Sequence, residues 1–262
     1  MDANKKEVVA IFHLYRKDGS ALFLHPFDDL ERFLDIIKSS EIEGRYGREP
    51  RVESFTLFRN DLYRMIDAAV RRWISEARFI PRFLASAAIF LLSYLFFSFV
   101  LGDPLPMVDE LVIGLCIAAF GYLVLHRIDM RSEAVVRKTQ DLRAKIDRIY
   151  FQNDPFVLEM ENELDRSDGE APERMLDSIL GRSDFAFNIE NELEAAQLID
   201  YLERRFNRKD IRRQERLLSK KGSPSDETAR AAGFTKWAES RKLDLSLYAL
   251  YRQMKKSLKP VT

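Results

Sequence analysis

The sequence predicts a predominantly α-helical α+β membrane protein, and three observations lead to this fold class. Residues 83–101 run for nineteen residues without a charged side chain, and a second apolar run follows shortly after it. The chain before these runs alternates short aromatic-rich segments with amphipathic ones, whereas the chain after them has mostly helical periodicity. We therefore expect a small N-terminal ββαβα module, a two-helix transmembrane hairpin and a helical C-terminal cytoplasmic domain.

Composition excludes several kinds of site. The 262 residues include 42 basic and 42 acidic side chains, so no net charge favours nucleic acid as a partner. A single cysteine rules out an internal disulfide framework and a multi-cysteine zinc site. Three scattered histidines do not favour a histidine-based metal site.

The N-terminal module is predicted to occupy residues 1–80. Two apolar runs flank Asp18-Gly19, a pair that favours a hairpin turn because both residues tolerate positive φ. An amphipathic helix should follow, ending near Ile37, and residues 44–50 then form a loop. We expect a third strand through the apolar residues between Val52 and Phe58. A second helix is expected to be capped by Asn60 or Asp61.

The transmembrane hairpin is predicted within residues 81–128, with spans at about 83–101 and 108–126. The first run is long enough to cross the hydrocarbon core, and proline and glycine at 102–106 break the helix between the runs. Lysine and arginine flank both outer ends and are absent from the connecting loop. This distribution predicts an integral protein of the plasma or inner membrane with both termini cytoplasmic.

Small residues on the two spans predict how the hairpin packs, since close backbone approach supplies the contacts between helices in lipid. The candidate packing residues of the second span are Gly114, Ala118 and Gly121, which share one helical face. Those of the first span are Ala85 and Ala88, which should meet the Gly121 end of that face. Asp109 and Glu110 lie near the start of the second span, where carboxylates suit a helix N-terminus.

The chain beyond the hairpin is predicted to form a helical stalk at 129–150 and a helical domain at 151–262. Residues 151–203 contain fifteen acids and three bases, whereas residues 204–262 contain seventeen bases and six acids. Similar stretches at 156–165 and 185–194 both have an apolar helical face. We therefore expect both stretches to be helices.

We call residues 151–203 the acidic block and residues 204–262 the basic block. The basic block offers a candidate contact for lipid headgroups or an acidic partner, with nucleic acid a weaker alternative. Pairing between the acidic and basic blocks is the expected arrangement, because opposite charges this close in sequence attract one another. The basic residues that would make the contact are Arg204, Arg205, Arg208, Lys209, Arg212, Arg213 and Arg216.

No sequence motif predicts an enzyme. The chain has no phosphate-binding glycine loop, zinc-protease motif or nucleophile elbow, and it suggests no catalytic residue, cofactor or metal ligand. We expect a membrane-anchored, non-enzymatic adaptor or assembly protein that binds protein partners, with homo-oligomers as an option. The alternative is an oligomeric cation channel in which Asp109 and Glu110 surround the outer pore mouth.

Overall fold

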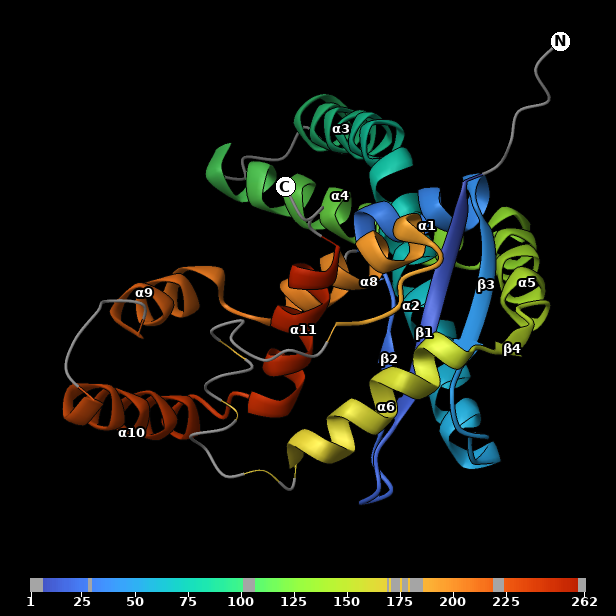
Figure 1. The fold of residues 1–262 in the computed structure, drawn as a ribbon. Coiled ribbons are helices and arrows are strands. Elements are labelled where there is room, and N and C mark those ends of the chain that lie inside the picture. Colours follow the sequence, from blue (N-terminus) through green and yellow to red (C-terminus); the bar gives the residue numbers. More distant parts are fainter. Residues whose placement is uncertain are drawn as a thin grey trace, which may run out of the picture. The chain divides into compact units, whose positions relative to one another are not determined.

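A computed structural model describes residues 7–27, 30–100, 107–168, 170, 175, 179, 186–218 and 224–258. The protein is mostly helical, with one small mixed sheet (Figure 1). It divides into two compact units. The αβ unit takes in the described residues of 7–27, 36–58 and 149–258, and the hairpin unit takes in 30–35 and 59–148. Both flanks of the apolar runs therefore contribute to the same unit.

The sheet has the strand order β2-β1-β3-β4. The β1 and β2 strands are antiparallel, whereas β1, β3 and β4 run parallel to one another. The fourth strand comes from the C-terminal flank, so that flank adds a strand to the N-terminal sheet as well as helices. The strands are β1 (Val8–Tyr15), β2 (Ala21–Leu24), β3 (Glu41–Tyr46) and β4 (Phe151–Asn153).

The first hairpin forms where the sequence predicts it. The turn closes with hydrogen bonds from Arg16 N–H to the Ser20 carbonyl and from Gly19 N–H to the Arg16 carbonyl, both 3.0 Å long. Gly19 has φ +87°, a conformation that side chains with a Cβ rarely adopt. The amphipathic helix that follows is α1 (Leu30–Ser39).

The predicted third strand at Val52–Phe58 is wrong, because these residues begin helix α2 (Val52–Ala77). Phe55, Phe58 and Leu62 recur every three to four residues, which is the helical period. The actual third strand, β3, is short and charged, and it overlaps the segment expected to be a loop. Asn60 and Asp61, expected to cap the helix, lie inside it.

The main core of the αβ unit lies between the sheet and the C-terminal helices. Helices α6 and α8 pack on β1, and α11 packs on both of these helices (Figure 1). Phe12 and Leu14 of β1 are fully buried beside Leu198, Leu202 and similar side chains. The helices of this flank are α6 (Pro155–Asp168), α8 (Glu192–Arg205), α9 (Arg208–Leu218), α10 (Pro224–Ser240) and α11 (Leu245–Ser257).

The second of the two similar stretches is not a helix over most of its length. Residues 186–191 have no regular structure, and α8 begins only at Glu192. Asn191 caps this helix, because its side-chain oxygen accepts hydrogen bonds from the N–H groups of Leu193 and Glu194. The cap sets the helix start inside the stretch that apolar periodicity had predicted to be helical.

The hairpin unit contains both apolar helices and the stalk. Helix α3 (Phe79–Leu95) continues into a π-helical turn at Phe96–Val100, and α4 (Met107–Met130) packs against α3. The predicted turn at 102–106 lies outside the described residues. The stalk is not continuous with α4, because the chain turns at Arg131 and Ser132 before α5 (Glu133–Asp147) begins.

Candidate functional site

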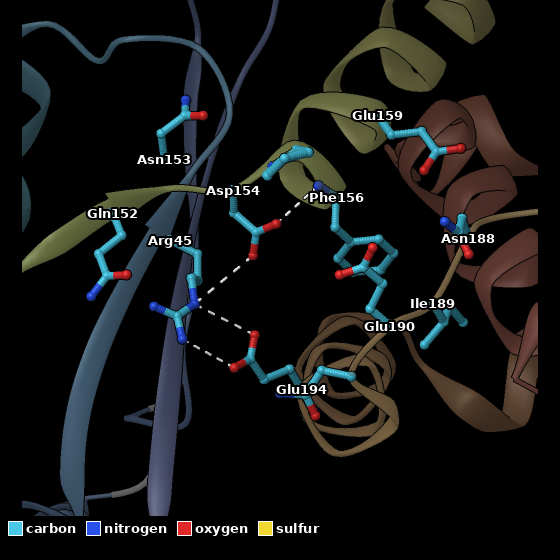
Figure 2. A pocket seen from close by; sticks show the side chains of 12 residues that line it. Arg45, Gln152, Asn153, Asp154, Phe156, Glu159, Asn188, Ile189, Glu190 and Glu194 are labelled. Atoms are coloured by element: carbon cyan, nitrogen blue, oxygen red, sulfur yellow. Dashed lines mark hydrogen bonds and ion pairs between the residues drawn. The ribbon is translucent and has the colours of Figure 1, made fainter.

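A cavity of about 350 Å³ lies at the carboxyl ends of β3 and β4, beside the start of α6 and α8 (Figure 2). Ligands of open α/β sheets commonly bind outside the carboxyl ends of parallel strands. We call this feature the strand-end cavity. Its lining includes four carboxylates and one guanidinium, together with amides and apolar groups, namely Arg45, Gln152, Asn153, Asp154, Pro155, Phe156, Glu159, Asn188, Ile189, Glu190, Asn191 and Glu194.

Arg45 of β3 organises one wall of the cavity (Figure 2). Its Nη2 donates to Glu194 Oε1 of α8 at 3.1 Å and to Glu43 at 2.6 Å, and its Nε lies 3.8 Å from Asp154. Burial disfavours the charged guanidinium, but hydrogen bonding and attraction to Glu194 and Glu43 raise the pKa of Arg45 overall. This residue therefore joins β3 to α8 and to the residue between β4 and α6.

The opposite wall carries carboxylates that Arg45 does not reach. Glu159 and Asn188 lie across the cavity from Arg45, as Figure 2 shows. Loss of water around Glu159 raises the pKa of its carboxyl, although the backbone N–H of Asn188 partly opposes this shift. Glu190 is exposed on the same segment. The lining therefore keeps an excess of negative charge after Arg45 has been paired.

A buried glutamate joins the two flanks beside the cavity. Glu161 of α6 is fully buried, and its carboxylate accepts hydrogen bonds from the backbone N–H groups of Tyr15 (2.8 Å) and Arg48 (2.7 Å). Burial is the main cause that raises its pKa. Gly47 leaves the necessary space, because a Cβ there would lie 2.6 Å from the Leu158 backbone. The ends of β1 and β3 are thus held against α6.

A second cavity, of about 450 Å³, lies where α8 ends, α9 begins and the α10–α11 turn passes. We call it the basic cavity. Arg205, Arg241 and Lys242 contribute its cations, and Trp237 adds a half-buried aromatic ring. Its other lining residues are Phe206, Asn207, Asp210, Ile211, Leu243, Asp244 and Leu247.

His13 is fully buried on the sheet face opposite the main core. Its ring meets Phe23 edge-on at a centroid distance of 4.5 Å and stacks with Phe55 at 5.6 Å. Neither ring nitrogen has a hydrogen-bond partner among the residues that the structure describes. Burial lowers the pKa of His13 to about 4, so the ring is neutral at physiological pH.

Arg82 is a buried polar residue of the hairpin unit, as His13 is of the αβ unit. Only 3% of the residue is exposed, and its guanidinium contacts His126, lies 3.4 Å from Asp129 and donates to the Ser75 carbonyl at 2.6 Å. From the sequence, Arg82 belongs to the lysine and arginine residues that flank the outer end of the first apolar run, and nothing there predicted its burial. Two of its partners, His126 and Asp129, lie about one turn apart near the end of α4, so Arg82 joins the start of α3 to the end of α4.

The predicted packing residues of the second span face α3. Gly114 and Ala118 are buried, and the Ser86 hydroxyl donates to the Ala118 carbonyl at 2.9 Å. A Cβ on Gly121 would lie 2.8 Å from Ile89 Cδ1. On the first span, Ala85 is half-buried and Ala88 is exposed.

The residues of the predicted ion pathway do not share one environment. Asp109 is exposed, whereas Glu110 is buried with 8% of its surface accessible. A charged ring in a pore requires side chains that face a common axis. A single chain does not bring these two carboxylates to one exposed surface.

The candidate basic residues are spread over the end of α8 and along α9. Arg204 pairs with Asp200, Arg216 has a partner of its own, and the side chain of Arg208 lies outside the described residues. The remaining four are exposed and form no ion pair among the residues that the structure describes, namely Arg205, Lys209, Arg212 and Arg213.

Sequence reasoning missed the strand-end cavity. Arg45 and Glu194 are 149 positions apart, and neither belongs to a motif. The charge imbalance of residues 151–203 was a signal that some acids needed distant cations, but it did not identify Arg16, Arg45 and Arg48 as their source. Within the described residues, no group of histidine, cysteine, aspartate and glutamate could hold a metal ion.

Comparison with protein families, curated protein sequences and solved structures finds no match.

Proposed function

We propose that the protein is a membrane-anchored adaptor whose αβ unit binds partners on one side of the bilayer. The observation that supports anchoring is the exposed apolar surface of α3 and α4. In the most apolar stretch of each helix, only 6% and 17% of the residues are buried. Phe83, Leu92 and Phe120 leave 58%, 69% and 69% of their surface accessible. Apolar surface of this extent is stable in lipid and costly in water.

The pairing of β3 with β4 supports a hairpin that returns to the side from which it started. These two strands are joined by residues 47–150, which contain both apolar helices. Gly44 pairs with Phe151, and the two flanks also share Arg45–Glu194 and Glu161 with the backbone of Arg48. A sheet that uses both flanks requires them to be in the same compartment, and hence an even number of crossings. The arginine-rich flanks favour the cytoplasmic side.

The strand-end cavity supports partner binding by the αβ unit. It is open to exposed groups such as Glu190, has both polar and apolar walls, and carries excess negative charge. These features suit a protein segment with basic and apolar side chains. We propose this surface as the partner contact of the adaptor.

Membrane insertion and sidedness are tested together by cysteine labelling of the full chain. Cys116 is replaced by Ser, and single cysteines are placed at Lys17, Leu105 or Lys242. An impermeant maleimide should label Leu105→Cys in intact cells, whereas Lys17→Cys and Lys242→Cys should react only after permeabilisation. The protein should remain in the membrane pellet at alkaline pH. Labelling of Lys17→Cys and Lys242→Cys from opposite sides, or alkaline release, would contradict the proposal.

Partner binding is tested by placing a photo-crosslinking amino acid at Glu190 in cells. The matched control position is Lys17, which is also exposed but lies in the β1–β2 turn. A discrete protein adduct at Glu190, absent at Lys17 and lost in Arg45→Ala, would support the adaptor. Equal or absent adducts at the two positions would count against the strand-end cavity as the contact.

A further inference from the structure

The acidic block finds many of its cations outside the basic block. Arginines of the first fifty residues pair with acids of the C-terminal flank, so the N-terminal flank supplies the positive charge. The pairs are Arg16–Asp168 at 3.7 Å, Arg45–Glu194 at 3.1 Å and Arg48–Asp165 at 2.5 Å. Within the two C-terminal blocks, Arg204 pairs with Asp200 and Lys255 with Glu203. Among the described residues, Arg205 and Lys242 of the basic block form no ion pair and can therefore bind another anion.

The basic cavity carries positive charge that its own acids do not neutralise. Asp210 is engaged by Arg241 at 3.5 Å, and Asp244 by Arg16 at 2.5 Å. Asp244 also caps α11 by accepting from the Leu247 N–H at 3.0 Å. Arg205 and Lys242 line the same cavity, are exposed, and form no ion pair among the described residues.

The walls of this cavity suit an anion with an apolar body. Phe206, Ile211 and Leu247 are buried residues of its lining, and Trp237 in the same lining is half-buried. Cations beside a tryptophan are the combination found where proteins meet the headgroup layer of a membrane. The exposed Lys209, Arg212 and Arg213 of α9 extend the positive surface beyond the cavity.

We propose that the basic cavity binds the phosphate of an anionic lipid headgroup, with Arg205 and Lys242 as the binding cations and Trp237 beside the glycerol and upper acyl chain. This inference rests on the proposed membrane anchor, which keeps the αβ unit within reach of the bilayer surface. An anionic leaflet attracts each nearby lysine or arginine, and the attraction is screened by salt. Docking on lipid would orient the αβ unit at the membrane and leave the strand-end cavity for partners.

The test uses the full chain with Trp73→Phe, so that Trp237 is the remaining tryptophan of the two. The protein is reconstituted in nanodiscs of neutral lipid or of neutral lipid mixed with phosphatidylserine or phosphatidylglycerol. The neutral and the anionic nanodiscs contain the same fraction of a lipid with a nitroxide quencher on its headgroup. Quenching of Trp237 should be strong in anionic discs and weak in neutral discs, and about 1 M salt should reverse it.

The decisive variant is Arg205→Gln with Lys242→Gln. Each cation at an anionic surface contributes about a factor of five, so the ratio of docked to undocked protein should fall about thirty-fold. The control is Lys17→Gln with Arg32→Gln, which removes two positive charges from exposed residues outside the cavity and should leave quenching unchanged. Circular dichroism checks that both variants are folded. The reversal of Trp237 quenching by salt is measured on protein with an intact cavity, so it tests the proposal even if a variant does not fold.

Each other outcome overturns the proposal. Equal quenching in neutral and anionic discs would show that charge does not direct docking, and loss of quenching in the control would remove the role of the cavity. If soluble glycerophosphate changes Trp237 emission while anionic discs do not, the cavity binds a free phosphate ester. If a polyglutamate peptide does so instead, the ligand is an acidic protein. If the proposed membrane anchor is wrong, the protein will not enter either kind of disc. This result differs from a failure of the basic cavity to bind lipid, in which the protein enters the discs without quenching of Trp237.

Discussion

The αβ unit and the hairpin unit hold their parts together by different physical means. In the αβ unit, charged side chains join segments that are far apart in sequence, as Arg45 does with Glu194 and Glu161 does with the backbone of Tyr15. In the hairpin unit, small residues let two helices approach, and Arg82 joins their ends. The αβ unit hides its apolar groups in a core, whereas α3 and α4 of the hairpin unit expose most of theirs.

Under the proposed membrane anchor, this difference follows from the solvent that surrounds each unit. A domain in water gains stability by burying apolar side chains, and it can place charged groups at its surface at little cost. Helices in lipid gain little from apolar contact, so shape and a few polar contacts fix their packing.

Gly47→Ala should destabilise the αβ unit by about 3 kcal/mol, because the new Cβ would lie 2.6 Å from the Leu158 backbone, which cannot rotate away. Gly233→Ala is the matched control, since a Cβ there meets nothing within 4 Å and Ala favours the helix. Urea unfolding followed by circular dichroism measures both. Equal stability of the two variants would mean that Gly47 is not tightly packed against α6.

Arg82→Ala should destabilise the hairpin unit by about 2 to 3 kcal/mol, because Asp129 and the Ser75 carbonyl would lose their buried cation. Arg82→Lys should recover little, since one ammonium cannot reproduce the separate directions of the guanidinium bonds. Thermal unfolding in mild detergent measures the loss. Full rescue by lysine would show that charge alone, without geometry, is sufficient.

Acid should destabilise the αβ unit through His13. The unfolded chain binds a proton below about pH 6.5, whereas the folded ring resists protonation until about pH 4. The stability contributed by the neutral ring is therefore complete above pH 6.5 and is lost as the pH falls toward 4, by about 2 kcal/mol at pH 5.

His13→Phe is the control for this pH dependence, since phenylalanine keeps the aromatic contacts with Phe23 and Phe55. Its unfolding free energy should fall less than that of the unsubstituted protein between pH 7 and pH 5. Identical pH profiles would contradict a neutral, buried His13.

Gly121→Ala should cost the hairpin only about 1 kcal/mol, because the atom it meets is the end of the flexible Ile89 side chain. Gly121→Leu should cost more than Leu123→Ala, since the larger side chain would separate α3 from α4 while Leu123 is exposed. Melting temperatures in detergent rank the three variants. A larger effect for Leu123→Ala would place the helix contact on another face.

Local signals predicted the elements whose stability is decided within a few residues. The Asp18-Gly19 turn, the amphipathic α1 and the two apolar helices follow from turn chemistry and periodicity. The third strand did not, because β3 is only six residues long, carries three charged side chains, and is stabilised by neighbours on both sides. One of those neighbours, β4, begins more than one hundred residues later.

The candidate sites were predictable in proportion to how local they are. The basic residues around Arg205 are visible as a run of charge, and the small residues around Gly114 as a helical face. The strand-end cavity brings Arg45 together with Asp154 and Glu194, and only the sheet pairing creates that proximity. A single sequence does not show which strands pair across an intervening hairpin.

A disulfide between the two flanks of the intact chain tests most directly whether both flanks build one domain. Tyr46 and Asn153 are partners in the β3–β4 register, so Tyr46→Cys with Asn153→Cys in a Cys116→Ser background should form an intrachain disulfide under mild oxidation. Ala21→Cys with Asn153→Cys should not, because β1 and β3 separate β2 from β4. Only intermolecular disulfides, or equal reaction of both pairs, would contradict a single domain built from both sides of the hairpin.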